Sequence, residues 1–191
     1  QRNGLSTPAV IDTNGDGVAD RVYAGDVHGN LWAFDLSSTK ATDWSVAHRG
    51  PLFTSTPRQP ITVRPEIIRH PAMPQSGNQP NLMIFFGTGQ YLVAGDNTTT
   101  DAQSFYAIWD RGDGRLKPAD LVEQVFLRTG QSGGRITDPD RWQRLKVDYK
   151  KSGTGDRYGW YLDLPDRGER VVTDARYRSG LVFFNTLVPS D

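Results

Sequence analysis

The chain of 191 residues contains no cysteine, which excludes disulfide bonds, thiolate nucleophiles and cysteine-based zinc sites. It has no excess of either charge, because 22 Lys and Arg residues balance 22 Asp and Glu residues. A neutral balance gives no bulk attraction to nucleic acid or to an anionic membrane, so neither is an expected partner. No apolar run approaches the roughly 20 residues that a spanning helix needs, so no membrane-spanning segment is predicted.

The amino terminus has neither the apolar stretch of a signal peptide nor an initiator methionine. The first four residues read Gln1-Arg2-Asn3-Gly4. We therefore expect the chain to be an excised or processed part of a longer protein. Its length suits one ordinary domain or a portion of a larger one.

Helical periodicity is scarce, and short runs rich in Val, Ile, Phe, Tyr and Trp take its place. Each run has the length of a strand and is bounded by Gly, Asn, Asp or Pro. The runs are residues 21–25, 30–35, 82–86, 104–109, 159–163 and 181–184. The one helical candidate is residues 118–125, and its continuation at 126–127 fits a strand equally well. The sequence therefore predicts an all-β fold.

The strand-like runs form a weak internal repeat. Three blade-like units cover residues 5–55, 60–130 and 155–191, and the last of them is truncated. Each unit opens with an entry strand followed by an aromatic or β-branched strand, and in the first two units a further strand ends at Asp35 or Asp110. Repeated small antiparallel sheets are typical of a β-propeller, so we predict part of one modified propeller domain.

The spacing of the repeat is irregular. The interval from Asp35 to Asp110 exceeds the roughly 40–50 residues of a regular blade. Insertions at residues 71–80 and 95–103 account for the excess, and their Pro, Asn, Thr and Gly content predicts surface loops. An open β-sandwich is the alternative fold.

The stretch DTNGDGVAD, residues 12–20, places an oxygen-bearing side chain at every second position. Carboxylates so close together repel each other, and a divalent cation removes that cost. Calcium prefers six to eight oxygen ligands, and EF-hand loops supply them at the first, third, fifth, seventh and ninth positions, with a glycine at the sixth. The same pattern predicts calcium ligands at Asp12, Asn14, Asp16, the carbonyl of Val18, and Asp20.

Two features distinguish this loop from an EF-hand. Tyr23 stands where an EF-hand has its bidentate glutamate, and both flanks are strand-like. We therefore predict a calcium-binding β-hairpin, similar to the loops of integrin α-subunit propellers, with a dissociation constant of about 10⁻⁵–10⁻³ M. An Asx-rich turn without metal is the alternative.

Four segments together resemble the C-terminal propeller of the PilY family of type IV pilus biogenesis factors and tip adhesins. They read STPAVIDTNGDGVADRVYAGDVHGNLWAFDL, IFFGTGQYL, FYAIWD and GLVFFNTLVP. The resemblance spans most of the chain but only part of the family's propeller. It implies export, an extracellular place at the pilus tip or outer-membrane surface, and pilus-tip components such as minor pilins, and host-cell or surface receptors, as partners. It also implies that calcium at Asp12, Asn14, Asp16, Val18 and Asp20 influences pilus extension and retraction, and so twitching motility and adhesion.

Other motifs carry weaker signals. Arg111-Gly112-Asp113 could offer a cation and a carboxylate to an integrin, but a turn uses the same residues. Gly87-Thr88-Gly89-Gln90 lacks the ending of a phosphate loop, and we expect a turn at a strand end. The histidines are scattered and no catalytic triad can be chosen, so no enzyme is predicted. A quinoprotein-type dehydrogenase propeller and a lectin-like domain are the alternatives.

Overall fold

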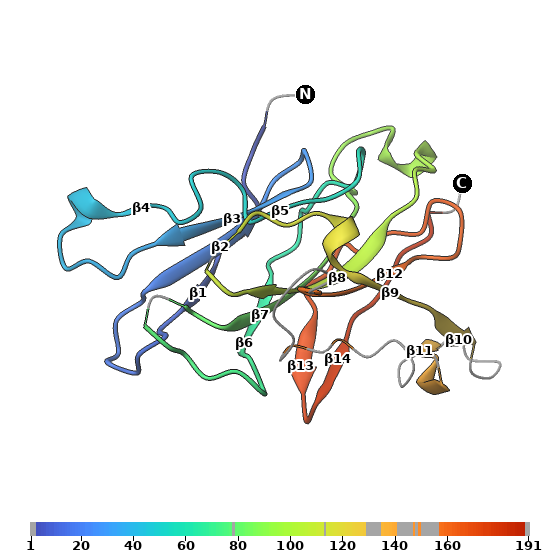
Figure 1. The fold of residues 1–191 in the computed structure, drawn as a ribbon. Coiled ribbons are helices and arrows are strands. Elements are labelled where there is room, and N and C mark those ends of the chain that lie inside the picture. Colours follow the sequence, from blue (N-terminus) through green and yellow to red (C-terminus); the bar gives the residue numbers. More distant parts are fainter. Residues whose placement is uncertain are drawn as a thin grey trace.

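The structure is a computed structural model that describes residues 3–77, 79–112, 114–128, 135–140, 147, 149 and 157–189 (Figure 1). Its strands form two five-stranded sheets and two two-stranded hairpins. The all-β prediction is therefore confirmed. None of the described residues belongs to a helix long and apolar enough to cross a membrane.

The first sheet is an antiparallel meander in sequence order. The first strand pairs with the second and the second with the third, and the third pairs with both of the short strands that follow it. A 3₁₀ helix, η1 (Ala41–Asp43), lies in the connection after the third strand. The strands are β1 (Ala9–Ile11), β2 (Arg21–Gly25), β3 (Asn30–Asp35), β4 (Ser45–Val46) and β5 (Phe53–Thr54).

The second sheet has the order β6-β7-β8-β12-β9, so its last two strands are reached by a crossover. Strand β12 runs antiparallel to β8 and parallel to β9. The 3₁₀ helices η2 (Asp96–Thr98) and η3 (Pro118–Asp120) lie in its connections. The strands are β6 (Glu66–Arg69), β7 (Leu82–Gly87), β8 (Ser104–Asp110), β9 (Val122–Gln124) and β12 (Gly159–Asp163).

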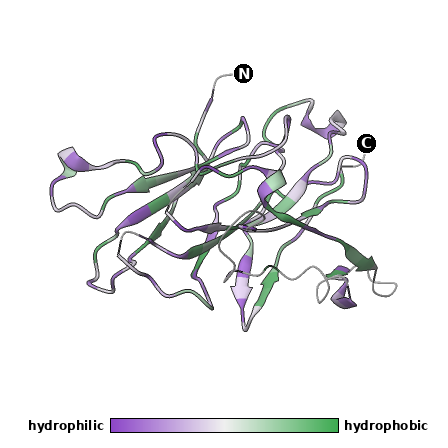
Figure 2. Ribbon diagram, viewed as in Figure 1, coloured by the Kyte–Doolittle hydropathy of each residue, from purple (hydrophilic) through white to green (hydrophobic). Residues whose placement is uncertain are grey.

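Two hairpins complete the described structure. Strand β10 (Phe126–Arg128) pairs with β11 (Arg135–Thr137), and β13 (Arg176–Arg178) pairs with β14 (Leu181–Phe183). Figure 2 shows β10 and β14 as mostly hydrophobic and β13 as mostly hydrophilic. Strand β6 lies beside both β1 and β13 (Figure 1), so the entry strands of the three predicted units are neighbours, as in adjacent blades of a propeller.

The structure differs from the sequence-based expectations at two places. Residues 118–125 are not a helix: a 3₁₀ turn at 118–120 leads into β9, because residues 122–124 find a parallel partner in β12. Strand β12 itself lies in the second sheet, although the third unit was predicted to begin at residue 155. Its pairing with β8 brings Tyr161 opposite Tyr106, with ring centroids 5.9 Å apart, and such cross-strand aromatic pairs favour this placement.

The core is centred on β7 and β8, in which every residue is buried. Strands buried on both faces read as continuous apolar runs rather than alternating ones, which is why these two were recognisable in the sequence. Aromatic rings join the sheets: Phe53 of β5 packs on Tyr106 of β8 at 4.8 Å and on Phe86 of β7 at 5.7 Å. Packing between the two sheets is therefore mainly apolar and aromatic.

A buried histidine packs against aromatic rings of this core. His70, which follows β6, is 5% exposed, and its Nδ1 accepts hydrogen bonds from the backbone N–H groups of Ala72 and Met73. Its ring packs edge-on against Tyr149, with centroids 4.4 Å apart. Burial lowers the pKa of His70 from 6.5 to about 4, because the imidazolium form would lose its hydration.

We expect the stability of the protein to fall as the pH drops from about 6.5 to about 4. Over this range His70 takes up a proton in the unfolded chain but stays neutral in the folded one, so protonation favours unfolding. In urea unfolding between about pH 8 and pH 4, the free energy of unfolding should therefore fall more steeply with decreasing pH for the native chain than for His70→Gln. The exposed His28→Gln serves as the control and should keep the native slope. Equal slopes for the native chain and His70→Gln would contradict the assignment.

Candidate metal centre

The acidic loop joins β1 to β2 as a hairpin connection. Ile11 is the register partner of Arg21, and the N–H of Asp20 donates to the carbonyl of Ile11 at 3.0 Å. Residues 12–20 thus project from the end of two paired strands, with no helix on either side. This is the hairpin setting that the flanking residues predicted.

Asp12 organises the first half of the loop. Its carboxylate accepts hydrogen bonds from the N–H groups of Gly15 at 2.6 Å and Gly17 at 2.8 Å. Both glycines have φ near +85°, at 85° and 87°, a region that L side chains rarely adopt, so the tight curvature depends on them. The bond from Gly17, followed by that from Gly15, lowers the pKa of Asp12 and favours its ionised form.

Asn14 and Asp16 lie on the exposed side of the loop and bond to it locally. The side-chain oxygen of Asn14 accepts from the N–H of Asp16 at 2.8 Å, and Asp16 accepts from the N–H of Val18 at 2.8 Å. The side chain of Val18 is 63% exposed. Both polar side chains are thus accessible from solvent, and the proposed role of the Val18 carbonyl stays a prediction.

Asp20 closes the loop from a buried position. It is 6% exposed, and its Oδ2 accepts bonds from Thr13 through the N–H at 2.7 Å and the hydroxyl at 2.6 Å. The N–H of Asn14 adds a third bond at 3.2 Å. Sequence reasoning missed Thr13, although a small hydroxyl residue between two ligand positions is the signal that could have found it.

The donor chemistry of the loop fits calcium. Carboxylate, amide and carbonyl oxygens are hard ligands, and they occur here at alternate positions around two turn-forming glycines. Within the described part of the chain, however, no three His, Cys, Asp or Glu side chains are gathered closely enough to hold a metal ion. The three aspartates instead accept hydrogen bonds from the loop, so they would have to converge for an ion to bind.

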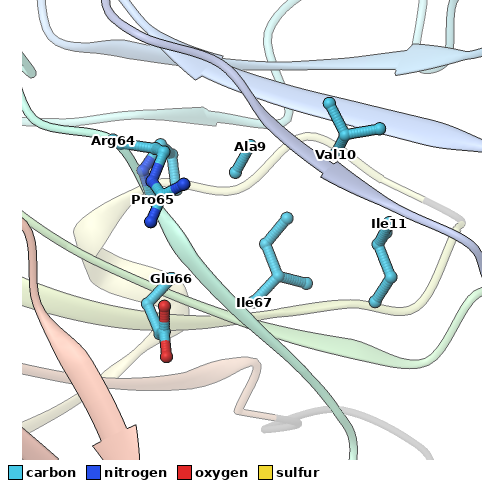
Figure 3. Close-up of a pocket in the computed structure, with 7 residues that line it drawn as sticks. All are labelled: Ala9, Val10, Ile11, Arg64, Pro65, Glu66 and Ile67. Carbon is cyan, nitrogen blue, oxygen red and sulfur yellow. The ribbon is translucent and has the colours of Figure 1, made fainter. Parts of the chain in front are cut away.

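A crevice between β1 and β6 is lined by Ala9, Val10, Ile11, Arg64, Pro65, Glu66 and Ile67 (Figure 3). Its two charged residues contact the third unit. Arg64 lies 3.5 Å from Asp174, and the carboxylate of Glu66 accepts the N–H of Tyr177 at 3.0 Å. Arg64 and Glu66 are therefore both engaged in contacts between sheets. The described residues that line the crevice include no histidine, serine or threonine.

The Arg-Gly-Asp sequence lies at the end of β8. The guanidinium of Arg111 packs over the rings of Trp109 and Tyr158, at 5.5 and 5.0 Å from their centroids, and donates to the Tyr158 hydroxyl at 3.0 Å. Gly112 donates its N–H to Asp110, while Asp113 lies outside the described residues. Where they are described, these contacts are those of a turn.

The Gly87–Gln90 segment is not the expected strand-end turn, because Gly89 continues the pairing in a parallel bridge with Ile61. Gly87 is the last residue of β7, and the N–H of Gly89 donates to the carbonyl of Pro60 at 2.8 Å.

Comparisons with known proteins agree with the fold. The family described as "PilY1 beta-propeller domain" matches residues 1–125. A type IV pilus biogenesis factor PilY1 homolog of Xylella fastidiosa is 36% identical over 205 residues, covering 98% of this chain. The type IV pilus biogenesis factor PilY1 of Pseudomonas aeruginosa is 32% identical over 232 residues, covering 99% of it.

A solved structure matches the fold. The crystal structure of the Pseudomonas aeruginosa PilY1 C-terminal domain has a TM-score of 0.77 and 31% identity, and the match covers 98% of this chain. The chain spans 45% of that solved chain, and 13% and 19% of the Xylella and Pseudomonas proteins. The likeness therefore concerns one part of much longer proteins.

We expect Asp20→Ala to destabilise the protein even when a chelator removes all divalent ions. The substitution leaves the buried Thr13 hydroxyl and two backbone N–H groups without their acceptor, which costs about 1–3 kcal/mol of unfolding free energy. Urea unfolding in chelator measures the loss. Asp16→Ala is the matched comparison, because Asp16 lies on the exposed side of the loop, and it should cost much less. Equal losses for the two variants would contradict the anchoring role of Asp20.

Proposed function

The chain belongs to the family of PilY1 β-propeller domains, and from this premise we propose that it is a calcium-binding module of a type IV pilus biogenesis factor. The observation that carries the proposal is the hairpin between β1 and β2, in which five oxygen donors alternate along nine residues. The proposed ligands are Asp12, Asn14, Asp16, the carbonyl of Val18, and Asp20.

The anchored residues give the proposed site its shape. Asp12 is held by the N–H groups of Gly15 and Gly17, and Asp20 is held by Thr13, so the first and last ligands are fixed at the two ends of the loop. Asn14 and Asp16 lie between them on the exposed side. A bound calcium ion would supply the positive charge that offsets repulsion among the three aspartates.

The ion preference follows from the kind of ligands. Calcium accepts a loose shell of carboxylates, carbonyls and water, whereas magnesium demands near-octahedral geometry and loses its water reluctantly. The loop has no bidentate glutamate at the position of Tyr23, so water is expected to complete the shell. The loop should therefore bind calcium more weakly than a cytosolic buffer does, and magnesium more weakly still.

The proposed biological role is regulation of the pilus. We place the protein outside the cell, at the pilus tip or the outer-membrane surface, with tip components such as minor pilins, and cell or surface receptors, as partners. Its function is binding and regulation and not catalysis. Calcium would order the hairpin and leave the packed sheets unchanged, because packed cores change between discrete arrangements and do not deform continuously. Pilus extension and retraction, and hence twitching and adhesion, would respond to that local change.

We expect calorimetry to detect calcium binding with a dissociation constant of about 10⁻⁵–10⁻³ M and much weaker magnesium binding. Asp16→Ala should weaken calcium binding strongly, because it removes an exposed ligand without touching the anchors at Asp12 and Asp20. Asp43→Ala, which removes an exposed carboxylate of η1, is the charge-matched control and should leave the isotherm unchanged. Equal affinities for the two ions, or an unchanged isotherm for Asp16→Ala, would refute the site.

In the full-length protein, we expect Asp16→Ala to reproduce calcium depletion. Twitching of cells that carry this variant in calcium-replete medium should match that of native cells in chelator, because both lack the charge that orders the hairpin. Cells that carry Asp43→Ala should twitch like native cells. If Asp16→Ala abolishes calcium binding in calorimetry but twitching still responds to chelator, the regulatory role of this loop is wrong.

A further inference from the structure

The calcium loop is held from outside its own sheet by an arginine. Arg69 is the last residue of β6, and its guanidinium reaches two consecutive carbonyls at the start of the loop. Nη1 donates to the carbonyl of Thr13 at 2.8 Å, and Nη2 lies 3.4 Å from the carbonyl of Asp12 as a longer second bond. One side chain of the second sheet thus spans two residues of the hairpin in the first.

A second side chain from the second sheet's part of the chain, that of Gln75, also bonds to Thr13. The side-chain amide of Gln75, in the segment after β6, donates to the hydroxyl of Thr13 at 3.4 Å. Thr13 in turn donates to Asp20 through both its N–H and its hydroxyl. Thr13 therefore connects the second sheet to the proposed ligands at both ends of the loop, Asp12 next to it in the chain and Asp20 across the hairpin.

The hydrogen bonds from Arg69 and Gln75 join residues much farther apart in the sequence than the loop's other side-chain hydrogen bonds do. Among the described residues, the other side-chain hydrogen bonds of residues 12–20 join positions at most seven apart, whereas Arg69 is 56 residues from Thr13 and Gln75 is 62. The backbone of Arg69 is fixed by its pairing with Leu82 of the fully buried β7. The loop is thus tied to a rigid part of the second sheet.

We infer that Arg69 is a positioning residue for the calcium loop and that it couples calcium binding in the first sheet to the second sheet. The positioning part depends only on the contacts of Arg69, and the coupling part rests on the proposed calcium function. A loop already held in shape loses less conformational freedom when an ion binds, so the contact should raise affinity. Because coupling is reciprocal, bound calcium should in turn strengthen the contact with Arg69.

The positive charge of Arg69 would lower calcium affinity, whereas its positioning of the loop would raise it. The direction in which calcium affinity changes when Arg69 is replaced is therefore informative. A guanidinium near a cation site repels the ion, but the side chain of Arg69 is exposed, and water and salt screen charges at the surface. Its hydrogen bond to the carbonyl of Thr13 is direct and charge-assisted. We therefore expect the positioning effect to exceed the repulsion.

The first test is made in chelator and needs no calcium binding. Arg69→Met keeps much of the apolar stem and removes the donors. Amide exchange by NMR should become faster at Gly15 and Gly17, whose N–H groups bond to Asp12. Arg64→Met is the matched control, because it removes the same charge just before β6, where Arg64 faces Asp174. Unchanged exchange at both glycines in Arg69→Met would overturn the positioning role.

The second test measures the coupling. Calorimetry should show calcium binding about tenfold weaker in Arg69→Met, as expected for the loss of one charge-assisted hydrogen bond. Binding should be partly restored in Arg69→Lys and unchanged in Arg64→Met. In the native chain, calcium should also slow amide exchange at residues 69–77, and in Arg69→Met this response should disappear. Tighter binding in Arg69→Met, or no response at residues 69–77 in the native chain, would refute the coupling.

The two tests distinguish a failure of the proposed calcium function from a failure of the coupling through Arg69. If the native chain binds no calcium, the proposed function fails and the coupling fails with it, while exchange in chelator still decides whether Arg69 positions the loop. If calcium binds normally in Arg69→Met, the proposed function stands and the coupling is wrong.

Discussion

The buried carboxylate of Asp110 fixes how the two large sheets meet. Asp110 ends β8 with 0% exposure, and the first sheet supplies partners for it. The hydroxyl of Tyr23 donates at 2.6 Å, and the guanidinium of Arg21 lies 3.5 Å away. Burial raises the pKa of Asp110, but the contacts with His48, Arg21 and Tyr23 lower it below its ordinary value. Because an unpaired charge in this core would be very costly, β2 has to lie where its side chains reach the end of β8.

This constraint also places the acidic loop. Arg21, which pairs with Asp110, directly follows Asp20, and Arg69 binds the carbonyls at the opposite end of the loop. Two partly buried arginine contacts therefore connect both ends of the hairpin to the second sheet. The loop is free to respond at Asn14 and Asp16, but its ends are held by the junction between the sheets. An ion bound there, as proposed, would act on this junction without any repacking of the apolar core.

The sequence predicted what depends on local pattern and missed what depends on distant partners. Continuous apolar runs identified β7 and β8, and alternating oxygen donors with Gly15 and Gly17 identified the hairpin, because both signals lie within a few residues. The pairing of β12 with β8 was missed because the paired residues lie 51 to 59 positions apart, and the helical candidate at 118–125 contains β9 because residues 122–124 pair with the distant β12. No local pattern indicates that Arg69 reaches Thr13, since that contact exists only after two sheets have packed.

The contacts of β6 suggest why the proposed metal loop would fit at this place in the fold. The core is mainly apolar, but β6, which lies beside both β1 and β13, carries polar links in both directions. Glu66 accepts the N–H of Tyr177 in the third unit, and Arg69 donates to Thr13 in the first. Directional bonds of this kind set the angle between neighbouring sheets more strictly than apolar contact does, because hydrogen bonds weaken steeply when they are misaligned. A cation bound beside such a link would change the charge balance where the hairpin of the first sheet meets β6, while the apolar packing of both sheets stays as it is.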